Sequence, residues 1–173
     1  PPSIYPDMII RERQGDIEVL KMNFSVTNPI NWDMFNEMNA VLQELENDDE
    51  VRALVLTSSN EKFFSIGLDI PSLFGFDNGK FQSFLQAFNQ LCIDLYSYKK
   101  PTIAAVNGHA IAGGAVLALC CDYRYVTDGK LMGLNEIKLG LPLPYPIDRI
   151  TNQVCGNNNA MEIMKGGEFY KSD

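Results

Sequence analysis

The spacing of hydrophobic residues in the first third of the chain alternates between the period of a strand and that of a helix. Two runs with apolar positions, residues 8–14 and 16–22, flank Gly15 and predict a β-hairpin. A helix is expected from about Trp32 to Glu46, behind the favourable N-cap residue Asn31. Its apolar positions recur at helical spacing: Phe35, Met38, Leu42 and Leu45.

The rest of the chain continues the alternation of strands and helices. Short apolar runs at residues 52–57, 102–106 and 123–126 predict inner strands, whereas residues 60–67 are interpreted as a loop. Helices are expected over an apolar stripe from Phe81 to Leu95 and over three later segments: Gly113–Leu119, Ile147–Val154 and Ala160–Lys165. This order favours an α/β fold with a mostly parallel sheet, in which ligands gather where strands end and helices begin.

Length and charge narrow the class of protein. The 173 residues predict a single domain. The chain has 22 acidic residues against 14 Lys and Arg, a net charge of -8. This acid excess argues against nucleic acid and against an anionic membrane surface as partners, because both need clustered basic residues.

The cysteine pattern and the chain start bear on location and metal binding. Four cysteines without a CxxC pair, and a single histidine, predict no metal site and a protein inside the cell, in the cytoplasm. Residues 1–7 lack the pattern of a signal peptide. The uncharged stretch 101–121 is interrupted by proline and glycine, so we do not expect a membrane span.

Two glycine-bearing loops are the first candidates for chemistry. Residues 63–70 follow one predicted strand, and residues 107–114 follow another. Glycine permits close approach and unusual backbone angles, so two such loops that converge can aim two backbone N–H groups at a negative oxygen. The alternative is two structural turns, which the spacing alone favours.

Side chains offer fewer candidates. Neither GxGxxG nor GxxxxGK[ST] occurs, so no nucleotide-binding loop is predicted. Ser65 does not lie in a GxSxG motif, and the single histidine, His109, is more typical of a structural residue than of a catalytic base. A Ser-His-Asp triad is therefore not predicted. Glu136 lies in an apolar, glycine-punctuated stretch, where burial would raise its pKa towards that of a general base, although most glutamates are simply solvated.

Several segments together resemble the crotonase family of enoyl-CoA hydratases and isomerases. They are residues 51–57, 64–69 (Phe-Ser-Ile-Gly-Leu-Asp), 100–108, 112–114 (Ala-Gly-Gly), 121–124 and 136–141 (Glu-Ile-Lys-Leu-Gly-Leu), in the family's order and spacing. The resemblance implies a spiral of ββα units with two roughly perpendicular sheets, assembled as a homotrimer or hexamer. It implies an acyl-CoA thioester substrate, with coenzyme A as part of the substrate and no separate cofactor.

The resemblance also assigns site residues by motif. The backbone N–H groups of Leu68 and Gly113 would form an oxyanion hole for the thioester. The backbone of Ile66 would meet the adenine, and Asp69 and Ile70 would continue that binding loop. Phe74, Phe76, Phe84 and Phe88 are candidates for the acyl pocket, although the helical spacing of the last two favours a place in the core.

Members of the family that catalyse different reactions differ in the acidic residues at three positions. In this chain only one of these positions holds an acid. Val116 occupies the first hydratase glutamate position, Glu136 the second, and Pro144 the position of a further aspartate in dienoyl-CoA isomerases. This pattern resembles the Δ3,Δ2-enoyl-CoA isomerases, with Glu136 as the catalytic base. The alternatives are hydration by Glu136 alone, another crotonase reaction such as thioester hydrolysis, or a non-catalytic acyl-CoA binder.

The chain departs from the family pattern at two places. Residues 22–28 contain no Arg or Lys to meet the CoA phosphates, which leaves Lys62, Lys99 and Lys100 as candidates. Family chains continue into C-terminal helices that cover the site and build the trimer. We therefore expect residues 1–173 to form a single crotonase-like core domain that lacks this helical segment.

Overall fold

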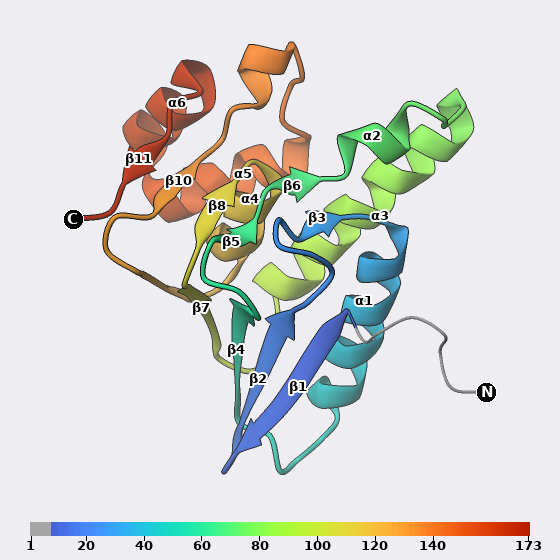
Figure 1. The fold of residues 1–173 in the computed structure, drawn as a ribbon, viewed down its shortest axis with the longest axis vertical. Coiled ribbons are helices and arrows are strands. Elements are labelled where there is room, and N and C mark those ends of the chain that lie inside the picture. The colour runs from blue at the N-terminus through green and yellow to red at the C-terminus, as the bar shows by residue number, and fades with distance from the viewer. Residues whose placement is uncertain (1–7) are drawn as a thin grey trace.

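The computed structural model describes residues 8–173, and Figure 1 shows its fold. Residues 1–7, on which the prediction of no signal peptide rests, lie outside this range. The strands are β1 Ile9–Gln14, β2 Ile17–Met22, β3 Pro29–Ile30, β4 Ala53–Ser58, β5 Phe63–Ser65, β6 Gly67–Leu68, β7 Thr102–Val106, β8 His109–Ile111, β9 Tyr123–Val126, β10 Leu131–Gly133 and β11 Tyr170–Lys171. The helices are α1 Trp32–Glu46, α2 Ile70–Leu73, α3 Asn78–Tyr96, α4 Gly113–Cys120, the 3₁₀ helix η1 Glu136–Leu139, α5 Tyr145–Cys155 and α6 Asn157–Gly166.

The larger sheet has five strands in the order β1-β2-β4-β7-β9. β1 and β2 form the antiparallel hairpin, and the other neighbours are parallel. β9 lies at one edge of this sheet, so the prediction of an inner strand at residues 123–126 is wrong in position. The rings of Tyr123 and Tyr125 are accordingly exposed.

A second sheet has the order β11-β10-β8-β5, and the short strands β3 and β6 form a separate parallel pair. β5 and β6 lie in the segment that was interpreted as a loop, and this interpretation is wrong. The two strands have three and two residues, too short for an alternating pattern to be visible. They place the first glycine-bearing loop between β3 on one side and β8 on the other.

The hydrophobic core is built from side chains of the five-stranded sheet and of the helices α1, α3, α4 and α5. The ring of Phe35 in α1 stacks on that of Phe88 in α3, with centroids 5.8 Å apart. The Phe84 ring, also in α3, packs against the Phe35 ring with centroids 4.8 Å apart. Every residue of α4 is buried, which explains why its sequence is apolar on all sides. Cys120 and Cys121 belong to this core, as expected for small apolar residues.

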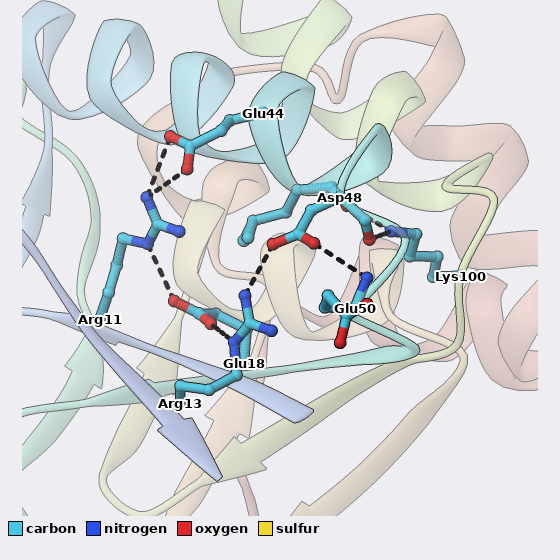
Figure 2. Close-up of polar contacts among 8 residues, drawn as sticks. Arg11, Arg13, Glu18, Glu44, Asp48, Glu50 and Lys100 are labelled. Carbon is cyan, nitrogen blue, oxygen red and sulfur yellow. Dashed lines mark hydrogen bonds and ion pairs between the residues drawn. The ribbon is translucent and has the colours of Figure 1, made fainter. Parts of the chain in front are cut away.

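An ion-pair network holds the hairpin against the end of α1 (Figure 2). The carboxylate of Glu18, which is 4% exposed, receives hydrogen bonds from Arg11 at 2.9 Å and Arg13 at 2.6 Å. Arg11 also donates a hydrogen bond to Glu44, in the last turn of α1, and Arg13 donates one to Asp48, just after that helix. Lys100 donates to the backbone carbonyls of Leu45, in the last turn of α1, and of Asp48, just after it.

Most of the predicted elements are confirmed. The hairpin, the helix at residues 32–46 with its cap, and the strand at residues 102–106 occur as expected. The Asn31 side chain accepts a hydrogen bond from the Met34 amide at 3.0 Å, which is the predicted N-cap. The four predicted helices downstream correspond to α3, α4, α5 and α6.

Candidate active site

An apolar cavity of about 350 Å³ lies where α3, α4, β6 and η1 meet. Its walls come from four segments far apart in sequence: residues 66–73, residues 81–88 of α3, residues 111–116 at the start of α4, and residues 135–147. The polar side chains among its lining residues are those of Asn135 and Glu136. A cavity of this kind suits an apolar ligand that is oriented by a few polar groups.

Two backbone amides, those of Leu68 and Gly113, flank one side of this cavity. The Asp69 amide donates to the Ile30 carbonyl of β3 at 2.9 Å. β6, which contains Leu68, is therefore fixed beside β3, with which it forms a parallel pair. A methyl group on Gly113 would lie 3.4 Å from the Leu68 nitrogen, so the two amides border the same small space.

Gly67 is required at this position for two reasons. Its φ of +90° is a conformation that side-chain-bearing residues rarely adopt. A methyl group on Gly67 would also lie 2.7 Å from the Gly113 nitrogen, inside the space that a hydrogen-bond acceptor of that amide needs. Glycine therefore keeps the approach to the Gly113 N–H open.

The backbone before Gly113 is strained. Ala112, which precedes the first residue of α4, has φ 49° and ψ -124°, an unfavourable conformation for alanine. Such strain costs about 1–3 kcal/mol and persists only where neighbours enforce it. Here the Ala112 amide donates to the Gly133 carbonyl at 2.9 Å, which anchors the turn. The turn directs the N-terminal end of α4, with its partial positive charge, at the cavity.

Glu136 is the one acidic side chain among the lining residues of the cavity. It lies at the start of η1, and burial raises the pKa of its carboxyl above the ordinary 4.5, although a hydrogen bond from its own backbone opposes the rise. Within residues 8–173, its Oε2 atom is buried and has no hydrogen-bond partner. The arrangement is that of a carboxylate with raised proton affinity, ready to accept a proton in an apolar site.

Asn135 is a lining residue that the sequence did not single out. It is the N-cap of η1, but its side chain makes no capping hydrogen bond, which is the usual function of Asn at this position. Its Oδ1 atom is buried without a partner in the described part of the chain. The only sequence signal was its place before Glu136, which does not reveal that the side chain reaches the cavity.

The other predicted site residues divide into those at the cavity and those elsewhere. Ile66 and Ile70 line the cavity with Leu68, and Val116 lines it from α4. Asp69 does not line the cavity and is instead the N-cap residue of α2. Of the four candidate phenylalanines, Phe88 lines the cavity and also belongs to the core, whereas Phe84 lies only in the core. Phe74 is 86% exposed, and neither it nor Phe76 is a lining residue.

Two of the candidate lysines for CoA phosphates have other partners. Lys99 pairs with Glu46 at 3.1 Å, and Lys100 caps α1. Both therefore lie at the end of α1, which contributes no lining residue to the cavity. Lys62 is the remaining candidate of the three. It immediately precedes β5, and its ammonium group lies over the Phe63 ring.

His109 has a structural place. Its Nδ1 atom accepts a hydrogen bond from the Leu131 amide at 2.9 Å, and its ring packs edge-on against Phe63. Over residues 8–173, no group of three or more His, Cys, Asp or Glu side chains is arranged to hold a metal ion. No helix in the same range has the length and apolar character needed to cross a membrane.

Comparison with known proteins identifies the family. Residues 12–173 match the family described as enoyl-CoA hydratase/isomerase. The chain is 33% identical over 166 residues to the mitochondrial enoyl-CoA delta isomerase 1 of Rattus norvegicus, covering 94% of this chain and 57% of that protein. It is 31% identical over 166 residues to the short-chain-enoyl-CoA hydratase of Clostridium acetobutylicum, covering 95% of this chain and 64% of that protein.

A solved structure supports the same assignment. The human mitochondrial delta3-delta2-enoyl-CoA isomerase has a TM-score of 0.91 to this chain at 28% identity, covering 95% of this chain and 65% of that one. The chain thus spans less than two thirds of the length of these relatives. The crotonase-like fold expected from the sequence motifs is confirmed, and the chain belongs to the enoyl-CoA hydratase/isomerase family.

Proposed function

We propose that this protein is an acyl-CoA enzyme that stabilises a thioester enolate and converts 3-enoyl thioesters into 2-trans-enoyl thioesters. The observation that carries the proposal is a buried carboxylate, that of Glu136, in a cavity whose other lining side chains, apart from that of Asn135, are apolar. The amides of Leu68 and Gly113 border the same cavity. The 2-enoyl and 3-enoyl isomers differ only in the position of one double bond, so one base that moves one proton is sufficient.

The proposed reaction uses the carboxylate of Glu136 together with the amides of Leu68 and Gly113. The Glu136 carboxylate removes a proton from C2, and the electrons of the broken C–H bond move into the conjugated dienolate. The negative charge on the thioester oxygen is stabilised by the N–H groups of Leu68 and Gly113, each worth about 3 kcal/mol in such sites. Glu136 then returns the proton to C4, and the double bond forms between C2 and C3.

A second candidate, hydration of 2-enoyl thioesters, is favoured by one observation. Asn135, next to Glu136, lines the cavity, and its Oδ1 atom has no hydrogen-bond partner within residues 8–173, so it can accept a hydrogen bond from a water molecule held there. Against it, Val116 is an apolar residue that is 1% exposed, so α4 supplies no second carboxylate there. Thioester hydrolysis and non-catalytic binding of acyl-CoA are the remaining alternatives.

Coenzyme A as the carrier, an oligomer of three or six chains and a cytoplasmic location are further parts of the proposal. Lys62 is the lysine that we assign to the CoA phosphates. The named relatives include both a bacterial hydratase and mitochondrial isomerases, so the proposed location rests on the cysteine pattern.

The test is a comparison of the wild type with Glu136→Gln on 3-enoyl-CoA and 2-enoyl-CoA substrates of several chain lengths. Removing the base is expected to lower isomerase kcat by about 10²–10⁴-fold. Glu61→Gln, which neutralises an exposed glutamate, is the matched control and is expected to keep full activity.

The products distinguish the candidates. Conjugated product from the 3-enoyl substrate supports isomerisation, and hydroxyacyl product from the 2-enoyl substrate supports hydration. Free CoA would indicate hydrolysis, and tight binding without turnover would indicate a binding protein. Full isomerase activity in Glu136→Gln would contradict the assignment of the base.

A further inference from the structure

Ser65, at the end of β5, is fully buried and has no access to the cavity. It is 0% exposed and is absent from the lining residues, so it cannot act as a nucleophile on a bound ligand. Its hydroxyl donates to the Asn28 carbonyl at 2.7 Å and accepts the Gly67 N–H at 3.1 Å. Ser65 therefore links a fixed point in the core to the residue that precedes Leu68.

The fixed point is Asn28, which is 0% exposed and has a positive φ of 45°. Its side chain makes five hydrogen bonds, and these hold three separate segments of the chain together. It accepts from the amides of Phe24 and Ser25, and it donates to the Met22 carbonyl, the Ser58 hydroxyl and the Phe64 carbonyl. A residue with so many partners cannot move without breaking several of them.

The backbone at Gly67 needs a fixed hydrogen-bond partner to hold its conformation. Gly67 has more conformational freedom than any other residue type, and its ψ sets the plane of the peptide that carries the Leu68 N–H. The neighbouring amides of Ile66 and Asp69 are held by the carbonyls of Thr27 and Ile30. The Gly67 amide depends on the Ser65 hydroxyl, which is its hydrogen-bond acceptor.

We propose that Ser65 is a positioning residue that fixes the Leu68 N–H in the direction needed to bind the enolate oxygen. This inference rests on the function proposed above. A displacement of about 1 Å at a reacting centre costs about 10²-fold in rate. The effect of losing the hydroxyl falls on kcat, because the thioester oxygen gains most of its negative charge in the transition state.

The test compares Ser65→Ala with Thr102→Val. The control residue is also buried, and its hydroxyl also makes two hydrogen bonds, to the side chain and amide of Asp122, but it lies outside the cavity. Ser65→Ala is expected to lower kcat by about 10–100-fold with KM changed less than about threefold. Thr102→Val is expected to lose stability but to keep the wild-type kcat.

A spectroscopic measurement separates positioning from stability. Infrared difference spectra of a bound 2-enoyl-CoA labelled with ¹³C at the thioester carbonyl report how strongly the two amides polarise that bond. We expect the shift of this band to lower frequency in the wild type and in Thr102→Val, and a smaller shift in Ser65→Ala. Ser65→Cys, which keeps a weaker donor and acceptor, is expected to fall between Ser65→Ala and the wild type.

The outcomes separate the two proposals. Wild-type kcat and band position in Ser65→Ala, despite a loss of stability, would overturn the positioning role and leave the proposed function intact. If Ser65→Ala does not fold, the same wild-type values in Ser65→Cys would overturn it. A wild-type protein that neither turns over an acyl-CoA nor shifts the carbonyl band would overturn the proposed function and this inference together.

Discussion

At the scale of single residues, Glu136 shows how a functional group can oppose stability. Its carboxyl is buried, one of its oxygen atoms has no hydrogen-bond partner within residues 8–173, and burial raises its pKa above 4.5. The folded protein therefore binds the proton more tightly than the unfolded chain. The stability that this proton contributes is fully present below pH 4.5 and is lost as the pH rises through the folded pKa. At neutral pH the ionised carboxylate is a cost of folding.

The first prediction concerns the pH dependence of activity. Because Glu136 must be ionised to remove a proton, kcat/KM is expected to fall at acidic pH, with an apparent pKa above the ordinary glutamate value of 4.5. The measurement is a pH–rate profile of kcat/KM on a 3-enoyl-CoA. An acid limb at or below pH 4.5 would contradict Glu136 as the buried base.

The second prediction concerns stability at the same residue. Glu136→Gln is expected to raise the unfolding midpoint at neutral pH, although it lowers kcat, because a neutral amide carries no charge into the apolar site. The gain is expected to shrink as the pH falls towards 4.5, where the wild-type carboxyl becomes protonated in both states. Thermal unfolding of both proteins between pH 5 and pH 8 checks this. An equal difference at every pH would exclude the electrostatic origin.

At the scale of elements, the hairpin β1–β2 is joined to α1 through Glu18 (Figure 2). Burial raises the pKa of this carboxyl, but the hydrogen bonds from Arg11 and Arg13 outweigh it, and the net effect lowers the pKa below 4.5. The stabilising contribution is therefore present above pH 4.5 and is lost as the pH falls through the lowered value. The network lies at α1 and so is distinct from the cavity, to which α1 contributes no lining residue.

The third prediction follows from that network. Glu18→Gln is expected to lower the free energy of unfolding by about 1–3 kcal/mol at neutral pH, because a buried charged acceptor is lost. This loss of unfolding free energy is expected to be smaller in acid, where the wild-type carboxylate becomes protonated. Glu44→Gln is the matched control, since Glu44 also binds Arg11 but is 62% exposed, and little change is expected. Urea unfolding at pH 7 and pH 4 measures both variants, and equal losses would contradict the role of burial.

At the scale of the whole molecule, the fold brings together segments that begin up to 69 residues apart in the sequence. β6, the start of α4 and η1 meet at one cavity, although they begin at residues 67, 113 and 136. Several large apolar side chains outside the cavity remain exposed, among them Tyr123, Tyr125 and Tyr145. Apolar residues exposed one by one are ordinary on protein surfaces, so these side chains do not by themselves mark an interface.

The fourth prediction is the state of assembly. The family resemblance leads us to expect a homotrimer or hexamer in solution. Sedimentation equilibrium or light scattering of the purified protein measures its mass, which is expected to be three or six times that of one chain. A monomer at micromolar concentration would contradict the proposed assembly.

The sequence by itself determined the elements that have their own periodic signal. The helix at residues 32–46 was predicted with its cap and both ends, and the hairpin and several strands followed from apolar runs. Glu136 and the two glycine-bearing loops were also visible, because unusual residues in apolar surroundings are local features. The motifs in their order were sufficient to predict the family, which the comparisons confirmed.

The tertiary structure alone decided how these pieces meet. β5 and β6 are too short for a local signal, and they form only because β3 and β8 lie beside them. Contacts between residues far apart in sequence decide three features of the described part of the chain: the unpartnered Oδ1 atom of Asn135, the buried hydroxyl of Ser65 and the closeness of the Leu68 and Gly113 amides. Periodicity reports which face of an element is buried, whereas only packing across the molecule fixes which groups share a cavity.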